Sequence, residues 1–563
     1  MSDTLTRMFE ISGVANYKTL SENVINVLAE KDGISENDKQ FKCIDFLKKI
    51  KAQRLHNLIT IPAVCVQLVH QFYVGRLMEG SLCAIYMNML DMHIAKGLQK
   101  LEIEDFDTEK TCFVEIAQTF GTETTEYLRG NWSLVSSASS LAFKTLTDSN
   151  KESSLVFSES TITNLMTKKK LDYLLQTGII TKKKALALSS LKNVPYMFVH
   201  KTIQEFLASL YIAMNPTNTE DILNAIQSLY CDADSILGIG QLFIFTCGMC
   251  APAAERMSKH IMDVITCDIE SKLHSILDPN IENISSTYVA QRIILDGFIE
   301  MVANKQPCFQ LTLSHVLIDD EFEENDAFNT LIDMNISNII SLTIDMNIIS
   351  LTDRACSAQQ KPAYRVQEII SQSRETLSHL LLRGEGSFDI QGLKLKYLEC
   401  WRDSDISNLD CTYMHACEIW ANTLLSEARI FQSMSVTGKN IRILKLSFIE
   451  LSIDLHCLTL SNLTTLHTLI LYHTQILDTQ LYYLPQSIRK VVVVDDFPQD
   501  VKAMVEWSKS RDARVSCELD FCWYYENETY ICHWMQQQDS IDISRCELDG
   551  NFIFISWSTI LSK

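Results

Sequence analysis

The sequence predicts an α-rich multidomain region followed by an α/β leucine-rich-repeat solenoid, and three observations lead to this fold class. The chain has 563 residues, too many for one hydrophobic core, so several domains are expected. Up to about residue 330, apolar residues recur at three- and four-residue spacing, as in Ile25, Val27 and Leu28, which is typical of amphipathic helices. Beyond that point the spacing L-x-x-L-x-L appears repeatedly, which predicts short stacked strands.

The composition is that of an ordinary globular protein. Apolar residues make up 47% of the chain, and only 9 Pro and 17 Gly are present, which excludes collagen-like and mucin-like classes. The first residues, MSDTLTRMFEISG, lack a basic segment followed by an apolar one, so no signal peptide is expected. The most apolar stretch, residues 236–252, contains three glycines and is too short to cross a bilayer, so we interpret it as a buried helix. We therefore expect a cytoplasmic protein with no membrane partner.

Charge and cysteine content narrow the classes of partner further. The formal net charge is −21, and such an acidic chain is repelled by phosphate backbones and by anionic membranes. Two lysine clusters, at 168–170 and 182–184, are local exceptions. The 18 cysteines are scattered, and the one C-x-x-C, formed by Cys247 and Cys250, lies inside the apolar stretch. Buried thiols are therefore expected there rather than a metal or redox site.

The spacing of the leucine motifs predicts repeats over residues 331–563. The motif starts at Ile339, Leu377, Ile441, Leu466 and Ile488, and the last three starts lie 25 and 22 residues apart. This interval is typical of leucine-rich repeats, in which each repeat contributes a short strand whose alternate side chains enter a shared core. The other intervals are irregular, so degenerate repeats with insertions are expected. An acidic run that starts at Asp319, DDEFEEND, is predicted to be the linker before them.

The stretch YMFVHKTIQEFLASLYIA, from Tyr196 to Ala213, predicts an amphipathic helix by its own spacing. Its apolar face comprises Val199, Ile203, Phe206, Leu207, Leu210 and Tyr211. Lys201 and Glu205 lie near the opposite side at the spacing of an (i, i+4) ion pair. Taken alone, the stretch predicts a buried helix with His200 near its start, bonded to a backbone carbonyl.

The whole stretch also resembles the F-x-H-x-x-x-Q-E-F-x-A-x-x-Y signature that closes the winged-helix domain of NACHT-type NLR (NOD-like receptor) proteins. Seven residues match this signature: Phe198, His200, Gln204, Glu205, Phe206, Ala208 and Tyr211. Further segments resemble neighbouring parts of the family. Residues 9–28 resemble the strand and helix after the sensor-1 element, and residues 57–72 resemble the proline-containing segment of the first helical domain. Residues 155–180 resemble the preceding winged-helix elements, and residues 242–250 resemble a helix of the second helical domain. The resemblance covers roughly residues 7 to 330.

The resemblance implies a division into four parts. Residues 1–95 are a remnant of the NACHT nucleotide-binding domain with the first helical domain, 96–213 the winged-helix domain, 214–330 the second helical domain, and 331–563 the degenerate leucine-rich repeats. It also implies that His200 contacts the β-phosphate of ADP and that Pro62 packs on adenine. An imidazole can donate a hydrogen bond to a phosphate oxygen. Pro62 by itself is equally well explained as a proline at a helix start.

The sequence departs from the family at the phosphate site. It contains no G-x-x-x-x-G-K-[ST], and its only Gly-Lys pair, Gly438-Lys439, is followed by Asn440. Such a loop surrounds phosphates with backbone N–H groups and a lysine. An acidic Walker B strand is also absent from the first residues. Binding of ADP or ATP is therefore expected to be weak or absent, with no catalytic and no metal-binding residues, and the chain is not expected to be an enzyme.

We therefore expect an NLR-like innate-immune sensor or regulatory fragment that acts through ligand and protein–protein binding, without its own NTPase half. The expected partners are a protein or microbial ligand at the repeats and an oligomer of such receptors. Two alternatives stay open. A winged-helix nucleic-acid-binding protein would bind DNA with a steep salt dependence. A repeat-bearing ubiquitin-ligase adaptor would copurify with a ligase core, and a residual ATPase would turn over ATP.

Overall fold

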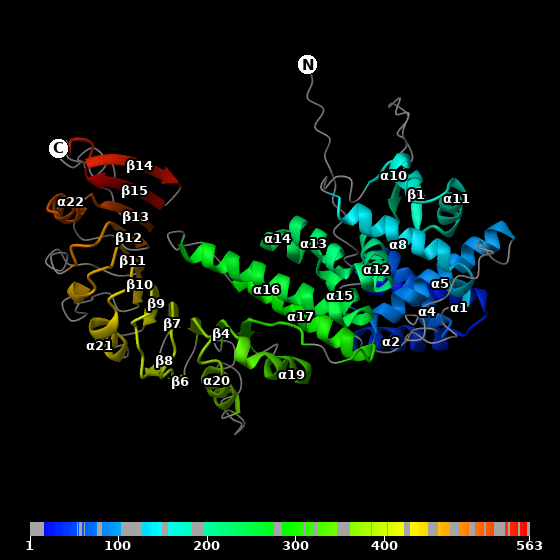
Figure 1. Ribbon diagram of the computed structural model, residues 1–563, viewed down its shortest axis with the longest axis horizontal. Helices are drawn as coiled ribbons and strands as arrows, with labels where there is room; N and C mark the ends of the chain where they lie inside the picture. Colours follow the sequence, from blue (N-terminus) through cyan, green and yellow to red (C-terminus); the bar gives the residue numbers. More distant parts are fainter. Residues whose placement is uncertain are drawn as a thin grey trace, which may run out of the picture. The chain divides into compact units, whose positions relative to one another are not determined.

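The computed structural model describes residues 16–52, 55, 59–60, 62–75, 81–102, 126–148, 156–182, 196–274, 284–307, 310–319, 325–345, 361–383, 386–401, 404–421, 428–448, 460–472, 484–494, 501–511, 514–522, 535–538, 541–549 and 552–559. The chain divides into two units (Figure 1). One comprises Met1–Ile261 with Arg292–Leu311, and the other Met262–Gln291 with Thr312–Lys563. These units do not follow the four predicted segments one for one, so the finer division stays a prediction.

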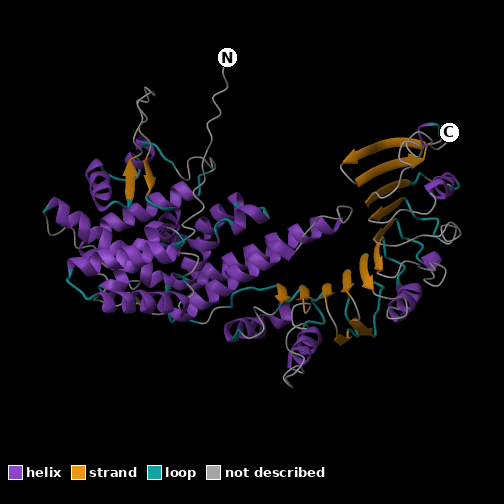
Figure 2. Cartoon of the chain, turned by 180° about the vertical axis from the view of Figure 1, so that it is seen from behind, coloured by secondary structure: helices purple, strands orange, loops and turns teal. Residues whose placement is uncertain are grey.

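The described part of the first unit is mainly helical (Figure 2). Its elements are α1 (Tyr17–Lys31), α2 (Glu36–Ala52), α4 (Pro62–Tyr73), α5 (Leu82–Leu101), α7 (Glu126–Gly130), α8 (Trp132–Leu146), α10 (Glu159–Thr163), α11 (Lys168–Thr177), β1 (Ile180–Lys182), β2 (Tyr196–Phe198), α12 (Lys201–Met214), α13 (Thr219–Leu229), α14 (Ala233–Leu237) and α15 (Gly240–Met249). Two long helices, α16 (Ala251–His274) and α17 (Ile284–Ala303), contribute to both units.

Helix α5 forms the centre of the first unit because it is buried along most of its length. Its Tyr86 ring packs on Phe206 of α12 and Phe245 of α15, with ring centroids 5.5 and 4.8 Å apart. The Phe206 and Phe245 rings contact each other edge to face at 5.1 Å. Such aromatic clusters bury a large apolar area and fix the packing of the helices that contribute to them.

The segment with the winged-helix resemblance contains a short antiparallel hairpin between helices. Strands β1 and β2 pair with Ile180 opposite Phe198, and Phe157 bridges to Tyr196 beside them. The predicted helix over the signature is confirmed, since α12 runs from Lys201 to Met214 with most of its length buried. The predicted (i, i+4) ion pair of Lys201 and Glu205 is also present, at 3.4 Å.

Residues 133–154 are rich in Ser and Thr, which by itself predicts a loop or a short connecting turn. This prediction is wrong for the first part of the segment, which forms α8. Ser and Thr fit inside this helix because their hydroxyls bond to backbone carbonyls of the preceding turn. Thr145 Oγ1 donates to Leu141 O at 2.9 Å, and Ser137 Oγ donates to Ser133 O at 2.9 Å. The small side chains let α8 pack closely on α12, so tertiary packing overrode the local loop signal.

The apolar stretch at 236–252 forms mainly α15, which is almost entirely buried, as predicted. Close packing explains its glycines. A Cβ on Gly248 would lie 2.5 Å from Cys83 Sγ, and one on Gly297 of α17 would lie 2.6 Å from the Phe243 ring. Glycine at these positions therefore permits the close approach of α15 to α5 and to α17.

The second unit is built on a mostly parallel sheet of eleven described strands. In chain order the strands are β3 (His315–Ile318), β4 (Ser341–Asp345), β5 (His379–Arg383), β7 (Tyr397–Trp401), β9 (Ala416–Ala421), β10 (Ile443–Phe448), β11 (Thr468–Tyr472), β12 (Lys490–Val494), β13 (Ser516–Cys522), β14 (Ile541–Asp549) and β15 (Phe552–Thr559). The helices around them are α19 (Asp326–Asn335), α20 (Lys361–Gln372), α21 (Ala428–Thr437) and α22 (Val501–Lys509). A separate pair, β6 (Gly386–Asp389) and β8 (Ser404–Ser407), lies beside the main sheet.

The prediction of an α-rich multidomain chain that ends in an α/β leucine-rich-repeat solenoid is wrong, because the fold is mixed and the second half forms this single large sheet. The leucine motifs do mark strands β4, β5, β10, β11 and β12. However, the sheet also includes strands without the motif, its last two strands are antiparallel, and its connections differ in length and content. Strand pairing over the whole sheet, rather than one repeated unit, therefore defines this half.

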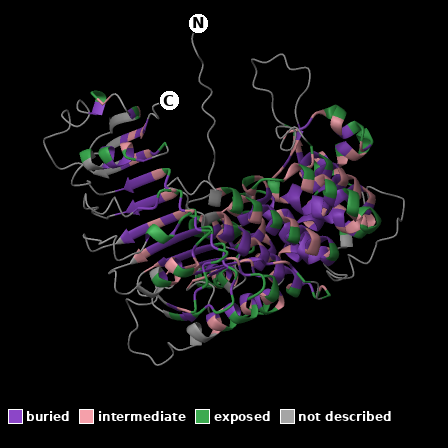
Figure 3. Ribbon diagram, turned by 60° about the vertical axis from the view of Figure 1, so that its left-hand side comes forward, coloured by how far each residue is buried: buried purple, intermediate pink, exposed green. Residues whose placement is uncertain are grey.

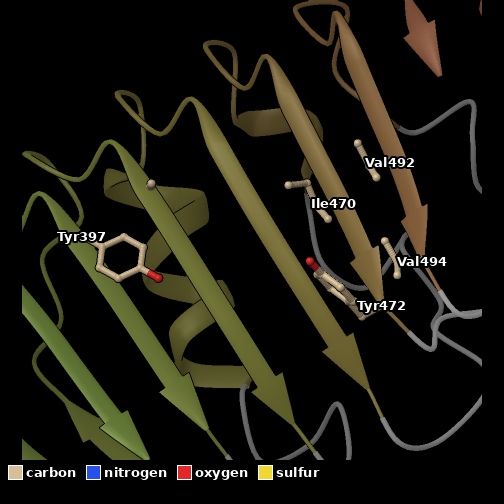
Figure 4. Packing of buried hydrophobic residues seen from close by; sticks show 6 residues of the cluster. Tyr397, Ile470, Tyr472, Val492 and Val494 are labelled. Carbon is tan, nitrogen blue, oxygen red and sulfur yellow. The ribbon is translucent and has the colours of Figure 1, made fainter. Parts of the chain in front are cut away.

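The register of the sheet separates two sets of side chains. Leu380, Leu398 and Leu444 occupy equivalent positions on their strands and are fully buried. Because successive side chains of a strand point to opposite faces, the positions between them belong to the other face. Helices α20, α21 and α22 lie on one side of the sheet (Figure 1), and Figure 3 shows that the strands are largely buried. We call the opposite face, which carries Tyr397 and Tyr472 (Figure 4), the front face.

Candidate functional site

His200, the predicted phosphate contact, lies at the N-terminus of α12. Its Nδ1 accepts a hydrogen bond from the backbone N–H of Thr202 at 3.1 Å and therefore caps the helix. Burial lowers the pKa of His200, so the ring is neutral at pH 7. Since Nδ1 accepts, the ring proton is assigned to Nε2, which is the nitrogen that could donate to a phosphate oxygen. The prediction of a backbone carbonyl as its partner is wrong, because the partner of Nδ1 is an N–H group.

Pro62 begins α4 and is exposed. Helices α4 and α5 are antiparallel, because Gln71 Nε2 donates to Ile85 O at 3.1 Å, while Gln67 lies beside His93 with 2.6 Å between their Nε2 atoms. The start of α4 therefore lies toward the C-terminal end of α5.

His200 is connected to the other end of α5. Thr202 Oγ1 lies 2.9 Å from His200 Nδ1 and accepts from the hydroxyl of Tyr86, near the start of α5, at 2.8 Å. No contact between described residues joins His200 and Pro62. Of these two residues only His200 carries a ring N–H that could donate to a phosphate oxygen, and the nucleotide role of both residues stays a prediction.

Glu205 of the signature is a buried carboxylate beside this site. Its side chain is 3% exposed and forms an ion pair with Lys201. Burial raises the pKa of Glu205 to about 7, and Lys201 offsets this only in part. Because the folded-state pKa lies above the unfolded value of 4.5, the folded state binds the proton more tightly. The contribution of Glu205 to the free energy of unfolding is therefore fully present below pH 4.5, and it is lost as the pH rises through 7.

Replacing Glu205 by glutamine is expected to remove this pH dependence. Between pH 5 and pH 8.5 the wild type should lose about 2–3 kcal/mol more unfolding free energy than E205Q, by linkage from the raised pKa. Urea unfolding followed by circular dichroism at both pH values measures the difference. The exposed Asp221, changed to Asn, is the control and should behave as wild type. Equal slopes of stability against pH in wild type and E205Q would contradict the assignment.

The first lysine cluster is largely engaged within the protein. Lys170 Nζ donates to Ser137 Oγ at 3.3 Å, and Lys169 Nζ lies 5.4 Å from the centroid of the Tyr173 ring. Of the second cluster, Lys182 lies over the Tyr196 ring at 5.2 Å, and residues 183–184 lie outside the described residues. Lys168, Lys169 and Lys182 are nevertheless exposed, so the winged-helix nucleic-acid alternative stays a prediction.

Cys247, of the predicted buried thiol pair, is fully buried, and Cys250 is partly buried. Burial is the largest cause that raises the pKa of both thiols. Among the described residues, no group of three or more His, Cys, Asp or Glu side chains is arranged to bind a metal ion.

A cavity of about 960 Å³ lies between α4, α5 and α7 in the first unit. This cavity is not among the sites predicted from the sequence. Polar and apolar groups line it together, among them Gln67, His70, Met89, Met92, His93 and Lys96. Four of these recur on α5 at three- and four-residue spacing, which in the sequence reads as an ordinary helix face. Burial lowers the pKa of His93, whose Nδ1 lies 2.9 Å from Thr177 O.

The front face of the sheet carries a column of stacked planar groups, which the sequence analysis also missed. The Arg383 guanidinium lies 4.7 Å from the centroid of the Trp401 ring. Trp401 stacks on Trp420 at 4.7 Å and 27°, and Trp420 stacks on Tyr472 at 5.5 Å and 25°. Trp420 and Tyr472 lie on strands that flank β10, where Ser447 is the residue opposite both. The small Ser447 side chain leaves room for the two rings to meet.

Paired charges lie directly beside this column. Arg383 Nε donates to Glu399 Oε1 at 2.8 Å, and Lys445 Nζ lies 3.3 Å from Glu418 Oε2. Trp420 Nε1 donates to Glu418 Oε1 at 2.7 Å. Each carboxylate is almost completely buried and has a cation beside it. Arg383 and Lys445 are therefore neutralised by Glu399 and Glu418, and they are not available to bind a phosphate backbone.

Comparison of the sequence with protein-family models finds no match, and comparison with curated proteins finds none either. The resemblance to NACHT-type receptors therefore rests on the residues quoted above. Among the described residues, no helix combines the length and the apolar character needed to cross a membrane.

Proposed function

We propose that this chain is a cytoplasmic regulatory or sensor protein related to the NACHT-type receptors of innate immunity, and that it acts through protein–protein contacts rather than catalysis. The observation that carries the proposal is the aromatic column formed by Arg383, Trp401, Trp420 and Tyr472 on the front face. Tryptophan, tyrosine and arginine are the side chains that dominate binding energy at protein interfaces. We place the binding surface for a protein or microbial ligand there.

The chemistry of the column supports a polypeptide partner over a nucleic acid. Trp401 and Trp420 are neither fully buried nor fully exposed, so part of each ring can contact a partner. The neighbouring cations Arg383 and Lys445 are neutralised by Glu399 and Glu418. A face with internally balanced charge does not attract a polyanion, and the chain as a whole carries −21.

An interaction experiment tests this surface. The double variant W401A/W420A of the full chain is compared with wild type by cross-linking in cells and reciprocal pull-down with each recovered protein. We expect at least a 10-fold loss of the specific partner, because removing two aromatic anchors costs more than about 1.4 kcal/mol. Tyr413, which is 50% exposed outside the column, provides the matched control Y413A, which should retain binding. Equal recovery of every partner by wild type and by the double variant would overturn the proposal.

We further propose that nucleotide switching is absent from this chain taken alone. His200 offers one ring N–H, and the sequence lacks a phosphate-binding loop, so ADP has few donors for its phosphates. The expected melting-temperature shift with millimolar ADP is below about 1 °C, and H200A should show the same shift as wild type. A saturable shift of several degrees that H200A abolishes would show that the nucleotide role is retained.

A further inference from the structure

We propose that Glu399, Tyr397 and Glu418 share one extra proton, and that this proton keeps the rings of the aromatic column stacked on one another. A rise in pH would release the proton to solvent and loosen the column. The consequence for partner binding rests on the proposed function. The protonation of the three side chains does not, and it can be measured without a partner.

Three oxygen atoms meet at Tyr397, and their two contacts need two protons. The Tyr397 hydroxyl lies 3.2 Å from Glu399 Oε2 and 3.1 Å from Glu418 Oε2, both within hydrogen-bond distance. A phenol has one proton and can donate to only one carboxylate. If both glutamates were ionised, the second contact would place a phenol lone pair against a carboxylate oxygen. A proton on one glutamate converts that contact into a hydrogen bond from the carboxyl to the phenol oxygen.

The surroundings make water a poor substitute for this proton. Tyr397, Glu399 and Glu418 are 9%, 5% and 8% exposed. Arg383 approaches Glu399 at Oε1, whereas the phenol contacts Oε2. Lys445 lies 3.3 Å from Glu418 and adds charge compensation there. The cations therefore stabilise the carboxylates, but no described contact supplies the missing hydrogen between the phenol and the second carboxylate.

The other titratable groups on this side of Tyr397 are His379 at the start of β5, Lys396 directly before β7 and Glu270 on α16. The His379 ring lies 6.4 Å from the Tyr397 ring, and burial lowers the pKa of His379 to about 4, so it is neutral near pH 7. Lys396 and Glu270 form an ion pair at 3.5 Å and act on His379 with opposite signs. Neutral His379 and the Lys396–Glu270 ion pair carry no net charge, so neither replaces the shared proton.

The two carboxylates connect the proton to the rings. Glu399 binds Arg383, whose guanidinium covers Trp401, and Glu418 accepts from Trp420 Nε1. The distance between the two glutamates therefore controls the spacing of Trp401 and Trp420. When the proton leaves, Glu399 and Glu418 both carry a negative charge. Their repulsion then acts to separate the rings of Trp401 and Trp420.

The pH direction follows from the environment of the acid. Burial, and next the charge of Glu418, raise the pKa of Glu399 above its ordinary value of 4.5. Burial also raises the pKa of Tyr397, so the phenol stays protonated throughout. The stacked column is therefore favoured at low pH, and it loosens as the pH rises through the raised pKa of Glu399.

Circular dichroism of the full chain tests the inference. Two indoles stacked at 4.7 Å couple as excitons, so the difference spectrum between wild type and W420F isolates the Trp401–Trp420 signal. We expect this signal to fall by at least half between pH 5 and pH 9 in wild type. In E399Q the amide can donate to the phenol at every pH, so the signal should stay constant.

The control is Glu506→Gln on α22, an exposed glutamate that pairs with Lys509, and it should follow the wild-type curve. A wild-type signal that is present but constant from pH 5 to 9, or an E399Q curve with the wild-type midpoint, would overturn the inference. Thermal melting of each variant at pH 7 shows that a missing signal does not reflect unfolding. If the spectra behave as expected while W401A/W420A retains every partner, the shared proton stands and the binding proposal fails.

Discussion

The E300A variant is expected to lose about 3–5 kcal/mol of stability in the first unit, the cost typical of removing a buried charged partner. Glu300 of α17 is 4% exposed. Its carboxylate accepts from Leu82 N and Cys83 N at 2.8 Å each, and from Ser81 Oγ at 3.0 Å. It therefore satisfies the free N–H groups at the start of α5 and interacts favourably with the helix dipole.

The measurement is urea unfolding at pH 7 with circular dichroism at 222 nm. E300Q retains one acceptor oxygen and should lose less than E300A, which separates the charge from the hydrogen bonds. Glu22 on α1 is exposed, and E22A should change stability by less than about 0.5 kcal/mol. A loss below about 1 kcal/mol for E300A would show that α5 does not depend on this carboxylate.

Acid is expected to destabilise the start of the sheet through two buried histidines. Burial is the largest cause that lowers the pKa of His315 on β3 to about 3 and of His379 on β5 to about 4. His315 Nε2 lies 2.7 Å from Thr266 Oγ1, and Nδ1 lies 3.0 Å from Ser341 Oγ. Because both folded-state pKa values lie below 6.5, their contribution to stability is complete above pH 6.5 and is lost as the pH falls toward 4.

Hydrogen–deuterium exchange of peptides from β3 to β5, corrected for intrinsic rates, measures this loss between pH 7 and pH 4.5. For His379 alone, the shift in pKa corresponds to about 3 kcal/mol once both states are below their pKa values. H379N cannot take up the proton, so the pH dependence of exchange should become shallower. H467N, at an exposed histidine, should keep the wild-type profile. If H379N and wild type exchange alike at both pH values, the acid sensitivity has another origin.

The elements that were predicted correctly are those with a strong local period. The apolar face of residues 199–211 and the Lys201–Glu205 spacing predicted α12 and its ion pair, because helix geometry places residues three and four apart on one side. The leucine motifs predicted strands β10, β11 and β12, because alternate leucines define a buried strand face. The motif could not reveal that neighbouring strands without leucines, such as β9 and β13, pair in the same register.

The candidate sites depended on contacts that no local pattern contains. Ser81 and Glu300 meet across 219 positions of the chain. Arg383, Trp401, Trp420 and Tyr472 each look unremarkable in their own strands and form a column only through the pairing of five strands. The small Ser447 between two of the rings carries no signal of its own.

Local periodicity in the amino-acid order was enough to predict helices such as α12 and α15 and the buried faces of strands β10, β11 and β12, because each depends on residues within a few positions of one another. Sheet order, the buried cap on α5 and the meeting of Tyr397, Glu399 and Glu418 were decided only when distant segments packed together. The physical reason is that hydrogen-bond partners and burial, which set protonation and stability, are properties of neighbours in space.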